Sequence, residues 1–217
     1  SIEESREDQS ATVEHGDVHL VRKVPGFKKI RFYTGENLGY GKVELPVHEL
    51  HTMAYWFSLR EADLAAIGLT RDETILGCLG LSFALHTVAT LMVMCDPRDL
   101  GRSVGDRSTA WFALADHGSV GLYSSGSSPE ETSLERIGAF EPTVFLFDNV
   151  PGGIGFSEKL FENHSELILQ ARHLIERCGC TDGCPSCVGP VNEVTRKTRG
   201  TALRIAKMIG TPAIVTQ

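Results

Sequence analysis

The sequence predicts a mixed α/β (α+β) domain in which a sheet packs against flanking helices, with one buried apolar helix and a four-cysteine knuckle near the C-terminus. Three observations support this prediction. Short runs with strand-like alternation occupy the first part of the chain, no formal charge occurs from Ile75 to Met94, and four cysteines fall within residues 178–187. A chain of 217 residues can bury a substantial hydrophobic core, so it does not need disulfides to fold.

The composition is that of an ordinary globular domain, with 41% hydrophobic and 23% charged residues and a formal net charge of −7. This charge argues against a surface built throughout for phosphate backbones, so any nucleic-acid contact must come from local basic patches. Residues 1–10 are acidic and are predicted to be a disordered tail before a single domain over residues 11–217. The acidic start lacks the apolar run of a secretory signal, which favours a cytoplasmic protein.

The first part of the predicted domain is rich in strands. Residues 18–43 contain short alternating runs separated by Pro-Gly and glycine-rich turns, which is typical of hairpins. Pro46 suits the first turn of a helix, so residues 46–59 are predicted to be helical. A short helix is also predicted over residues 60–68, ending at Gly68.

A long apolar helix is predicted over residues 74–94. Thr70 and Glu73 have the spacing of a capping box, and Pro97 favours an end before it. An uncharged run of this length also matches a membrane span. His86 within the run, acidic flanks and the lack of a lysine or aromatic belt favour a helix buried in the core. We therefore expect no membrane partner.

The C-terminal half is predicted to combine strands and helices. Residues 108–116 and 119–125 have strand character, and residues 143–148 suit a central strand because charge appears only at their last position. After a glycine-rich turn, an amphipathic helix is predicted over residues 155–177, and it leads to the cysteines. Residues 198–210 are predicted to form a last short helix.

The clustered cysteines have the spacing C-x-C-x3-C-x2-C and are Cys178, Cys180, Cys184 and Cys187. A disulfide between Cys178 and Cys180 would close a small strained ring. Cys184 and Cys187 have the C-x-x-C spacing of redox sites, but a thioredoxin-type site needs only two thiols. Four thiolates about 2.3 Å from a common centre form a structural zinc site without an open position for water. The sequence thus predicts one structural Zn²⁺, with an iron–sulfur cluster or thiol redox chemistry as alternatives.

Two glycine-rich segments raise the question of phosphate binding. Gly152, Gly153 and Gly155 place free backbone N–H groups near a helix N-terminus and form a candidate anion-binding turn, with a turn capped by Asp148 as the alternative. Residues 35–42 superficially resemble a P-loop, but the spacing is one residue too long and valine follows in place of Ser or Thr. The sequence therefore predicts no ATPase activity for this chain alone.

Aspartates and histidines supply two weaker candidates. Asp96, Asp99 and Asp148 could form a magnesium site for phosphodiester cleavage, although a helix cap and a turn explain the first two more simply. His48 and His51 are three residues apart without the H-E-x-x-H pattern of zinc proteases. They are interpreted as part of a polar helix face.

Two basic segments stand out from the acidic background. Basic residues interleaved with aromatic ones suit backbone tracking and base stacking on single-stranded nucleic acid, and a solvated surface has the same pattern. The candidate DNA-contacting residues are Arg22, Lys23, Lys28, Lys29 and Arg31, which lie among Phe27, Phe32 and Tyr33, and then Arg196, Lys197 and Arg199.

Several motifs together resemble a known family. FLFDNVPGGIGFSEKLF (145–161), followed by CGCTDGCPSCVGP (178–190), resembles the C-terminal zinc-binding domain of MrfA-type superfamily-two DNA helicases. GYGKVELP, HTMAYWF and CDPRDLG also look like that domain, so the resemblance covers most of residues 15–190. It implies that the four clustered cysteines are zinc ligands, that ATPase lobes belong to the same polypeptide, and that the parent protein acts in DNA repair.

The predicted function is that of a non-catalytic accessory domain of an ATP-dependent DNA helicase. Such a domain would help the helicase engage or separate DNA, with a single strand or a duplex junction as partner. The alternatives are a metal-dependent phosphodiesterase, a thiol-redox enzyme, and a structural protein-docking module such as one in a phage-defence protein.

Overall fold

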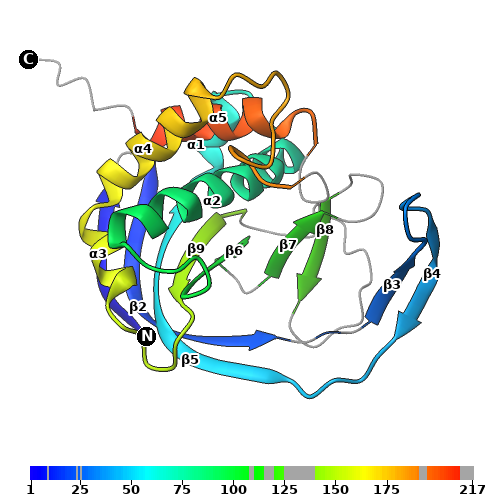
Figure 1. Ribbon diagram of the computed structural model, residues 1–217. Helices are drawn as coiled ribbons and strands as arrows, with labels where there is room; N and C mark the ends of the chain where they lie inside the picture. The colour runs from blue at the N-terminus through cyan, green and yellow to red at the C-terminus, as the bar shows by residue number, and fades with distance from the viewer. Residues whose placement is uncertain are drawn as a thin grey trace, which may run out of the picture.

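The structure is a computed structural model that describes residues 1–8, 10–22, 24, 26–107, 110–114, 120–124, 140–190 and 195–210. A seven-stranded antiparallel sheet carries the helices on one face (Figure 1). In spatial order its strands are β1 (Ile2–Asp8), β2 (Ala11–Arg22), β5 (His48–Leu59), β9 (Pro142–Asp148), β6 (Leu100–Asp106), β7 (Ala110–Leu114) and β8 (Val120–Ser124). The helices are α1 (Glu61–Ala66), α2 (Arg71–Val93), α3 (Phe156–Glu162), α4 (His164–Arg177) and α5 (Thr198–Ile209).

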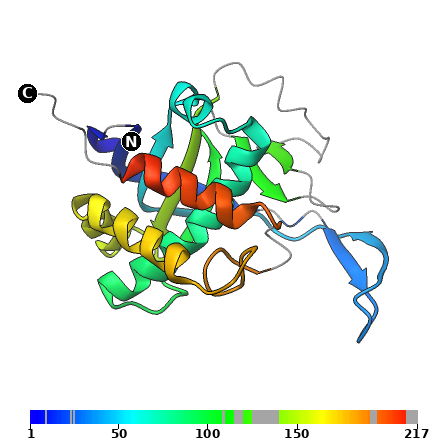
Figure 2. The same ribbon diagram turned by 90° about the horizontal axis from the view of Figure 1, so that it is seen from above.

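Helix α2 is the centre of the core. It lies on the sheet, and α4 and α5 cover it from the other side (Figures 1 and 2). Thr70 and Glu73 form the predicted capping box at its start, and it ends at Met94, which has φ 54°. Within the described residues α2 alone has the length and apolar composition of a membrane span, and 67% of that window is buried inside the domain. The predicted buried apolar helix is confirmed.

The predicted helix over residues 46–59 is wrong, because this segment forms the long strand β5. All of β5 pairs with β2, and Ala54–Ser58 also pair with β9 on the other edge. Tyr55 and Phe57 face the helices, while Trp56 packs on the opposite face of the sheet. Aromatic residues favour strands when both edges find partners, and this tertiary pairing outweighs the helix-start signal of Pro46.

The acidic tail predicted to be disordered is instead the edge strand β1. It pairs antiparallel with β2, and its side chains reach the helices. The Arg6 guanidinium lies 4.4 Å from the centre of the Phe161 ring and donates to the Phe161 carbonyl oxygen. An edge strand tolerates charged side chains because one of its sides stays in water.

Other elements follow the prediction more closely. Strand β9 is central, between β5 and β6, as expected for residues 143–148. Helices α1 and α5 form close to their expected positions, but the helix predicted over residues 155–177 breaks at Asn163 into α3 and α4. Strand β6 was not predicted, because LGRSVGD lacks a strand-like apolar alternation.

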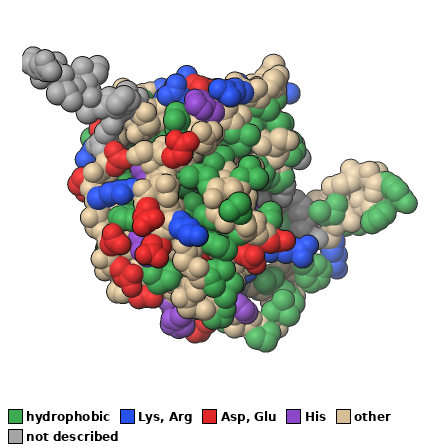
Figure 3. Space-filling view, turned by 60° about the vertical axis from the view of Figure 1, so that its left-hand side comes forward, with side chains coloured by type: hydrophobic (Ala, Val, Ile, Leu, Met, Phe, Trp, Pro, Cys, Tyr) green, Lys and Arg blue, Asp and Glu red, His purple; other side chains and the backbone are tan. Residues whose placement is uncertain are grey.

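A two-stranded ribbon extends from the sheet and carries a separate hairpin. The ribbon consists of Asp17–Arg22 of β2 and His48–Met53 of β5. These two segments pair with each other, and β9 does not pair with this part of β5. Strands β3 (Gly26–Ile30) and β4 (Asn37–Lys42) form the hairpin, which projects from the domain (Figures 1 and 2). Its surface is rich in hydrophobic side chains (Figure 3). Residues 35–42 belong to this hairpin and no helix follows them, as expected for a segment that is not a P-loop.

Candidate metal centre

The four predicted cysteines lie in one loop at the end of α4. Cys178 is the C-terminal capping residue of that helix, and a turn in which the Cys187 N–H donates to the Cys184 carbonyl closes the loop. Val188, the next residue, is buried against α2 and anchors the loop on the core. The loop is therefore positioned by two helices.

The sulfur atoms have the separations that a tetrahedral metal site requires. Sγ–Sγ distances are 3.5 Å for Cys178–Cys184, 3.6 Å for Cys180–Cys187 and 3.7 Å for Cys184–Cys187, and all four atoms lie within 4.8 Å of one another. Four thiolates at about 2.3 Å from a zinc ion are about 3.8 Å apart. The donor set therefore fits one zinc ion with four protein ligands.

The sulfur separations and the state of the thiols argue against disulfides and against a two-thiol redox site. A disulfide needs sulfur atoms about 2.05 Å apart, and all four thiols are free. Burial raises the pKa of the Cys187 thiol to about 12, so this residue needs a bound cation to be a thiolate near neutral pH. The pKa of Cys184 is lowered to about 7, mainly because the Ser186 backbone N–H donates to its sulfur. A two-thiol redox site would leave Cys178 and Cys180 unexplained.

Arg199 of α5 supports the cysteine loop from outside. Its guanidinium donates to the carbonyl oxygens of Ile175 and Cys178, at 3.1 and 3.2 Å. These are carbonyls of the last turn of α4, where a positive charge is favourable. Arg199 was predicted to contact DNA; its guanidinium is directed to the end of α4, and a DNA contact stays a prediction.

A comparison with protein families identifies this arrangement. The model of the MrfA Zn-binding domain family matches residues 81–188, which include the C-terminal part of α2 and all four cysteines. The chain belongs to the MrfA Zn-binding domain family. The metal implied by the cysteine spacing is thus also the metal for which the family is named.

Relatives agree with this assignment. The domain is 34% identical over 188 residues to the uncharacterized ATP-dependent helicase YprA of Bacillus subtilis, covering 87% of this chain and 21% of YprA. It is also 34% identical over 106 residues to the uncharacterized protein MJ1572.1 of Methanocaldococcus jannaschii, covering 46% of this chain and 88% of that protein. The chain therefore spans about a fifth of the helicase that it matches.

Solved structures show the same fold. The crystal structure of the DUF1998 helicase MrfA bound to DNA matches with a TM-score of 0.64 and 29% identity, over 96% of this chain and 24% of MrfA. A second MrfA crystal structure matches with a TM-score of 0.50 and 24% identity, over 94% of this chain and 22% of MrfA. The fold of about a quarter of MrfA is therefore shared by nearly the whole chain.

The candidate anion turn is filled by a side chain of the domain itself. Gly152, Gly153 and Gly155 have φ of 78°, 74° and 85°, as the predicted turn requires. The buried Asp148 carboxylate accepts the backbone N–H groups of Ile154, Phe156 and Ser157 at 2.6, 3.3 and 2.9 Å. Asp148 thus occupies the position that a phosphate would take, which is the capping alternative.

The aspartate site proposed for phosphodiester cleavage does not assemble. Asp148 is fully buried and engaged with the turn, and Asp96 accepts from the Arg98 backbone N–H. Within the described residues, the groups able to hold a metal are the four cysteines and a second cluster, His19, Glu49 and His51. None of the three aspartates belongs to either group.

The first basic segment lies on the ribbon and the hairpin. Arg22 donates to Asn149 Oδ1 at 3.4 Å, Arg31 pairs with Glu36 at 2.9 Å, and the Lys29 ammonium lies 5.9 Å from the centre of the Phe27 ring. Lys23 and the side chain of Lys28 lie outside the described residues. The second segment borders a hollow next to the metal loop, which is described below.

The cluster of His19, Glu49 and His51 was not predicted from the sequence. His48 and His51 were expected on one helix face, whereas they lie on opposite faces of strand β5. The pairing of β2 with β5 sets His19 directly opposite His51. The only signal for this cluster was the alternation of the two histidine-containing runs, and the pairing of distant strands cannot be read from one sequence.

Proposed function

We propose that the domain is a zinc-stabilised accessory part of a DNA helicase that helps the helicase engage or separate DNA strands and does no chemistry itself. Two similarities support this: YprA is named an ATP-dependent helicase, and an MrfA structure contains DNA. The four-thiolate centre leaves no position at which a water could be activated, which suits a structural metal. The family resemblance is also the support for placing this function in cytoplasmic DNA repair.

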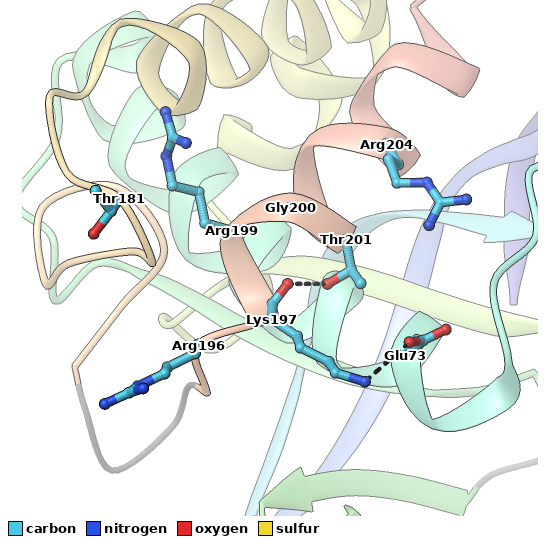
Figure 4. Close-up of a pocket in the computed structure, with 8 residues that line it drawn as sticks. All are labelled: Glu73, Thr181, Arg196, Lys197, Arg199, Gly200, Thr201 and Arg204. Carbon is cyan, nitrogen blue, oxygen red and sulfur yellow. Dashed lines mark hydrogen bonds and ion pairs between the residues drawn. The ribbon is translucent and has the colours of Figure 1, made fainter.

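A basic hollow beside the metal loop is the observation that carries the DNA proposal. It has a volume of about 350 Å³ and lies between the start of α5, the cysteine loop and the start of α2 (Figure 4). Its lining residues are Glu73, Thr181, Arg196, Lys197, Arg199, Gly200, Thr201 and Arg204. Four of these eight are cationic and one is acidic, so the hollow favours an anion.

The cations of the hollow differ in how free they are. Lys197 pairs with Glu73 at 3.4 Å, and Arg199 is directed to the end of α4 (Figure 4). Arg196 and Arg204 are exposed and have no ion pair with any described residue. The first turn of α5 contains no acidic residue, so its N-terminal dipole adds to the positive potential. We expect phosphates of the DNA backbone to bind at Arg196 and Arg204.

The projecting hairpin offers a second DNA contact. Phe32 and Tyr33 are 81% and 98% exposed and lie edge to face, with ring centres 4.9 Å apart. Exposed aromatic rings beside basic residues provide stacking platforms for the bases of a single strand. Lys29 and Arg31 on the same hairpin supply the accompanying charge.

The test is a DNA titration of the full-length helicase at several salt concentrations. Each neutralised phosphate contributes a slope of about −0.7 in log K against log salt for a single strand. Replacing both Arg196 and Arg204 with alanine should lower the affinity and flatten the slope by about 1.4. Lys159 and Arg98 are exposed on other elements, so the same double replacement there is the control. If the two double variants bind DNA alike, the basic hollow is solvated surface and protein docking becomes the better account.

A further inference from the structure

The cluster of His19, Glu49 and His51 lies on the ribbon that joins the main sheet to the hairpin. His19 and His51 are directly opposite each other on β2 and β5, and Glu49 is the diagonal neighbour of His19 on the same face. The two imidazole rings stack with centres 4.2 Å apart and planes 3° from parallel. His19 Nε2 is 3.3 Å from Glu49 Oε2. The ligand atoms of all three residues lie within 4.8 Å of one another.

These donors have the chemistry of a transition-metal site. Imidazole nitrogen together with a carboxylate oxygen suits borderline divalent ions, such as zinc, nickel and copper. Bonds of about 2.0–2.1 Å in a tetrahedral site place neighbouring ligand atoms about 3.4 Å apart. The His19–Glu49 separation already meets this distance, and a rotation of the exposed His51 ring would bring in its nitrogen.

We propose that His19, Glu49 and His51 form a second, exchangeable site for a divalent transition-metal ion, distinct from the four-cysteine centre. Three protein ligands leave at least one position for water, and all three residues are exposed. The ion therefore binds more weakly than zinc binds to four thiolates and exchanges with solution. It is not required for folding.

The position of the site gives it a mechanical role. An ion held by His19 of β2 and by Glu49 and His51 of β5 links the two strands of the ribbon. A two-stranded element is marginally stable in water, and the ribbon is the connection between the projecting hairpin and the core. An ion that binds only when β2 and β5 are paired shifts the equilibrium towards the paired strands and so stabilises the ribbon. The metal thus holds together the two strands that lead to the hairpin.

The experiment is a titration of the zinc-loaded 217-residue chain with Ni²⁺, followed by calorimetry. We expect one equivalent of Ni²⁺ to bind while the zinc stays in place. His19→Ala should weaken the binding at least tenfold, and Glu49→Gln should weaken it less. His48→Ala is the matched control, since His48 is an exposed histidine on the opposite face of the same ribbon and should leave the affinity unchanged.

A second measurement tests the mechanical role. Amide hydrogen exchange of Asp17–Arg22 and His48–Met53 should slow by up to about a hundredfold at a Ni²⁺ concentration one hundred times the Kd. Exchange in α2 should not change. The proposal is overturned if no equivalent binds beyond the cysteine centre, or if His19→Ala binds Ni²⁺ as the unmodified chain does. Binding without slower exchange in the ribbon would overturn the mechanical role. Because all variants are exposed, retained zinc and an unchanged circular dichroism spectrum verify their folding.

Discussion

Replacing Arg199 with alanine should destabilise the metal loop rather than weaken DNA binding directly. The guanidinium makes two hydrogen bonds, at 3.1 and 3.2 Å, to carbonyl oxygens of Ile175 and Cys178. Hydrogen bonds to a charged group contribute about 1.5–3 kcal/mol each, and the lower value applies to a half-buried side chain. The expected loss is about 3 kcal/mol, which in a domain of this size lowers Tm by roughly 6–12 °C.

Thermal unfolding of the zinc-saturated chain, followed by circular dichroism, measures this loss. Arg196→Ala is the matched control, because Arg196 is an exposed arginine of the same segment and its removal should change the stability by less than about 0.5 kcal/mol. DNA titration of both variants below their Tm completes the comparison. The prediction is contradicted if Arg199→Ala leaves Tm unchanged and loses as much DNA affinity as Arg196→Ala does. Arg199 would then be a DNA contact.

Two further predictions concern the core. Gly80→Ala in α2 should destabilise the domain by about 1–2 kcal/mol in urea unfolding, because the added Cβ would lie 2.5 Å from Thr198 Cγ2. This clash outweighs the gain of about 1 kcal/mol in helix propensity that alanine brings, and a stabilised variant would contradict the prediction. Burial lowers the pKa of His164 to about 4, so between pH 4 and 6.5 the unfolded chain binds the proton more readily and stability falls as the pH falls. The Arg6 charge also lowers this pKa, whereas the Asp8 carboxylate, 3.4 Å from the ring, favours the protonated form, so we expect a loss of at most about 3 kcal/mol. The stability difference between the unmodified chain and His164→Gln, measured at pH 7 and at pH 5, should change with pH; a constant difference would refute the role of His164.

The metal centre could be predicted from the sequence because its four ligands lie in one short segment. Their spacing and the glycines between them identify the site without knowledge of the rest of the fold. The long apolar helix and the strand over residues 143–148 were predictable for a similar reason. The helix has a local signal in the capping box at Thr70. The strand has one in its uncharged run, which is typical of a central strand, and β9 is central in the sheet.

The features that the sequence did not reveal depend on distant partners. Strand β5 is a strand because β2 and β9 pair with it, and no residue within 46–59 shows that pairing. Strand β1 is ordered by contacts of Arg6 and Asp8 with α3 and α4. The inward direction of Arg199 could not be predicted either, because basic residues look alike in a sequence whether they cap a helix or face water.

The central claim is that the four clustered cysteines hold one zinc ion on which the domain depends. The most direct measurement is elemental analysis of the chain after dialysis against a weak chelator, which removes metal from exposed sites. We predict one zinc per unmodified chain. Cys78 is buried in α2 and is not part of the four-cysteine group, so Cys78→Ser should also hold one zinc, whereas Cys184→Ser should hold none. Iron with acid-labile sulfide in anaerobically purified protein, or full retention of zinc by Cys184→Ser, would contradict the account.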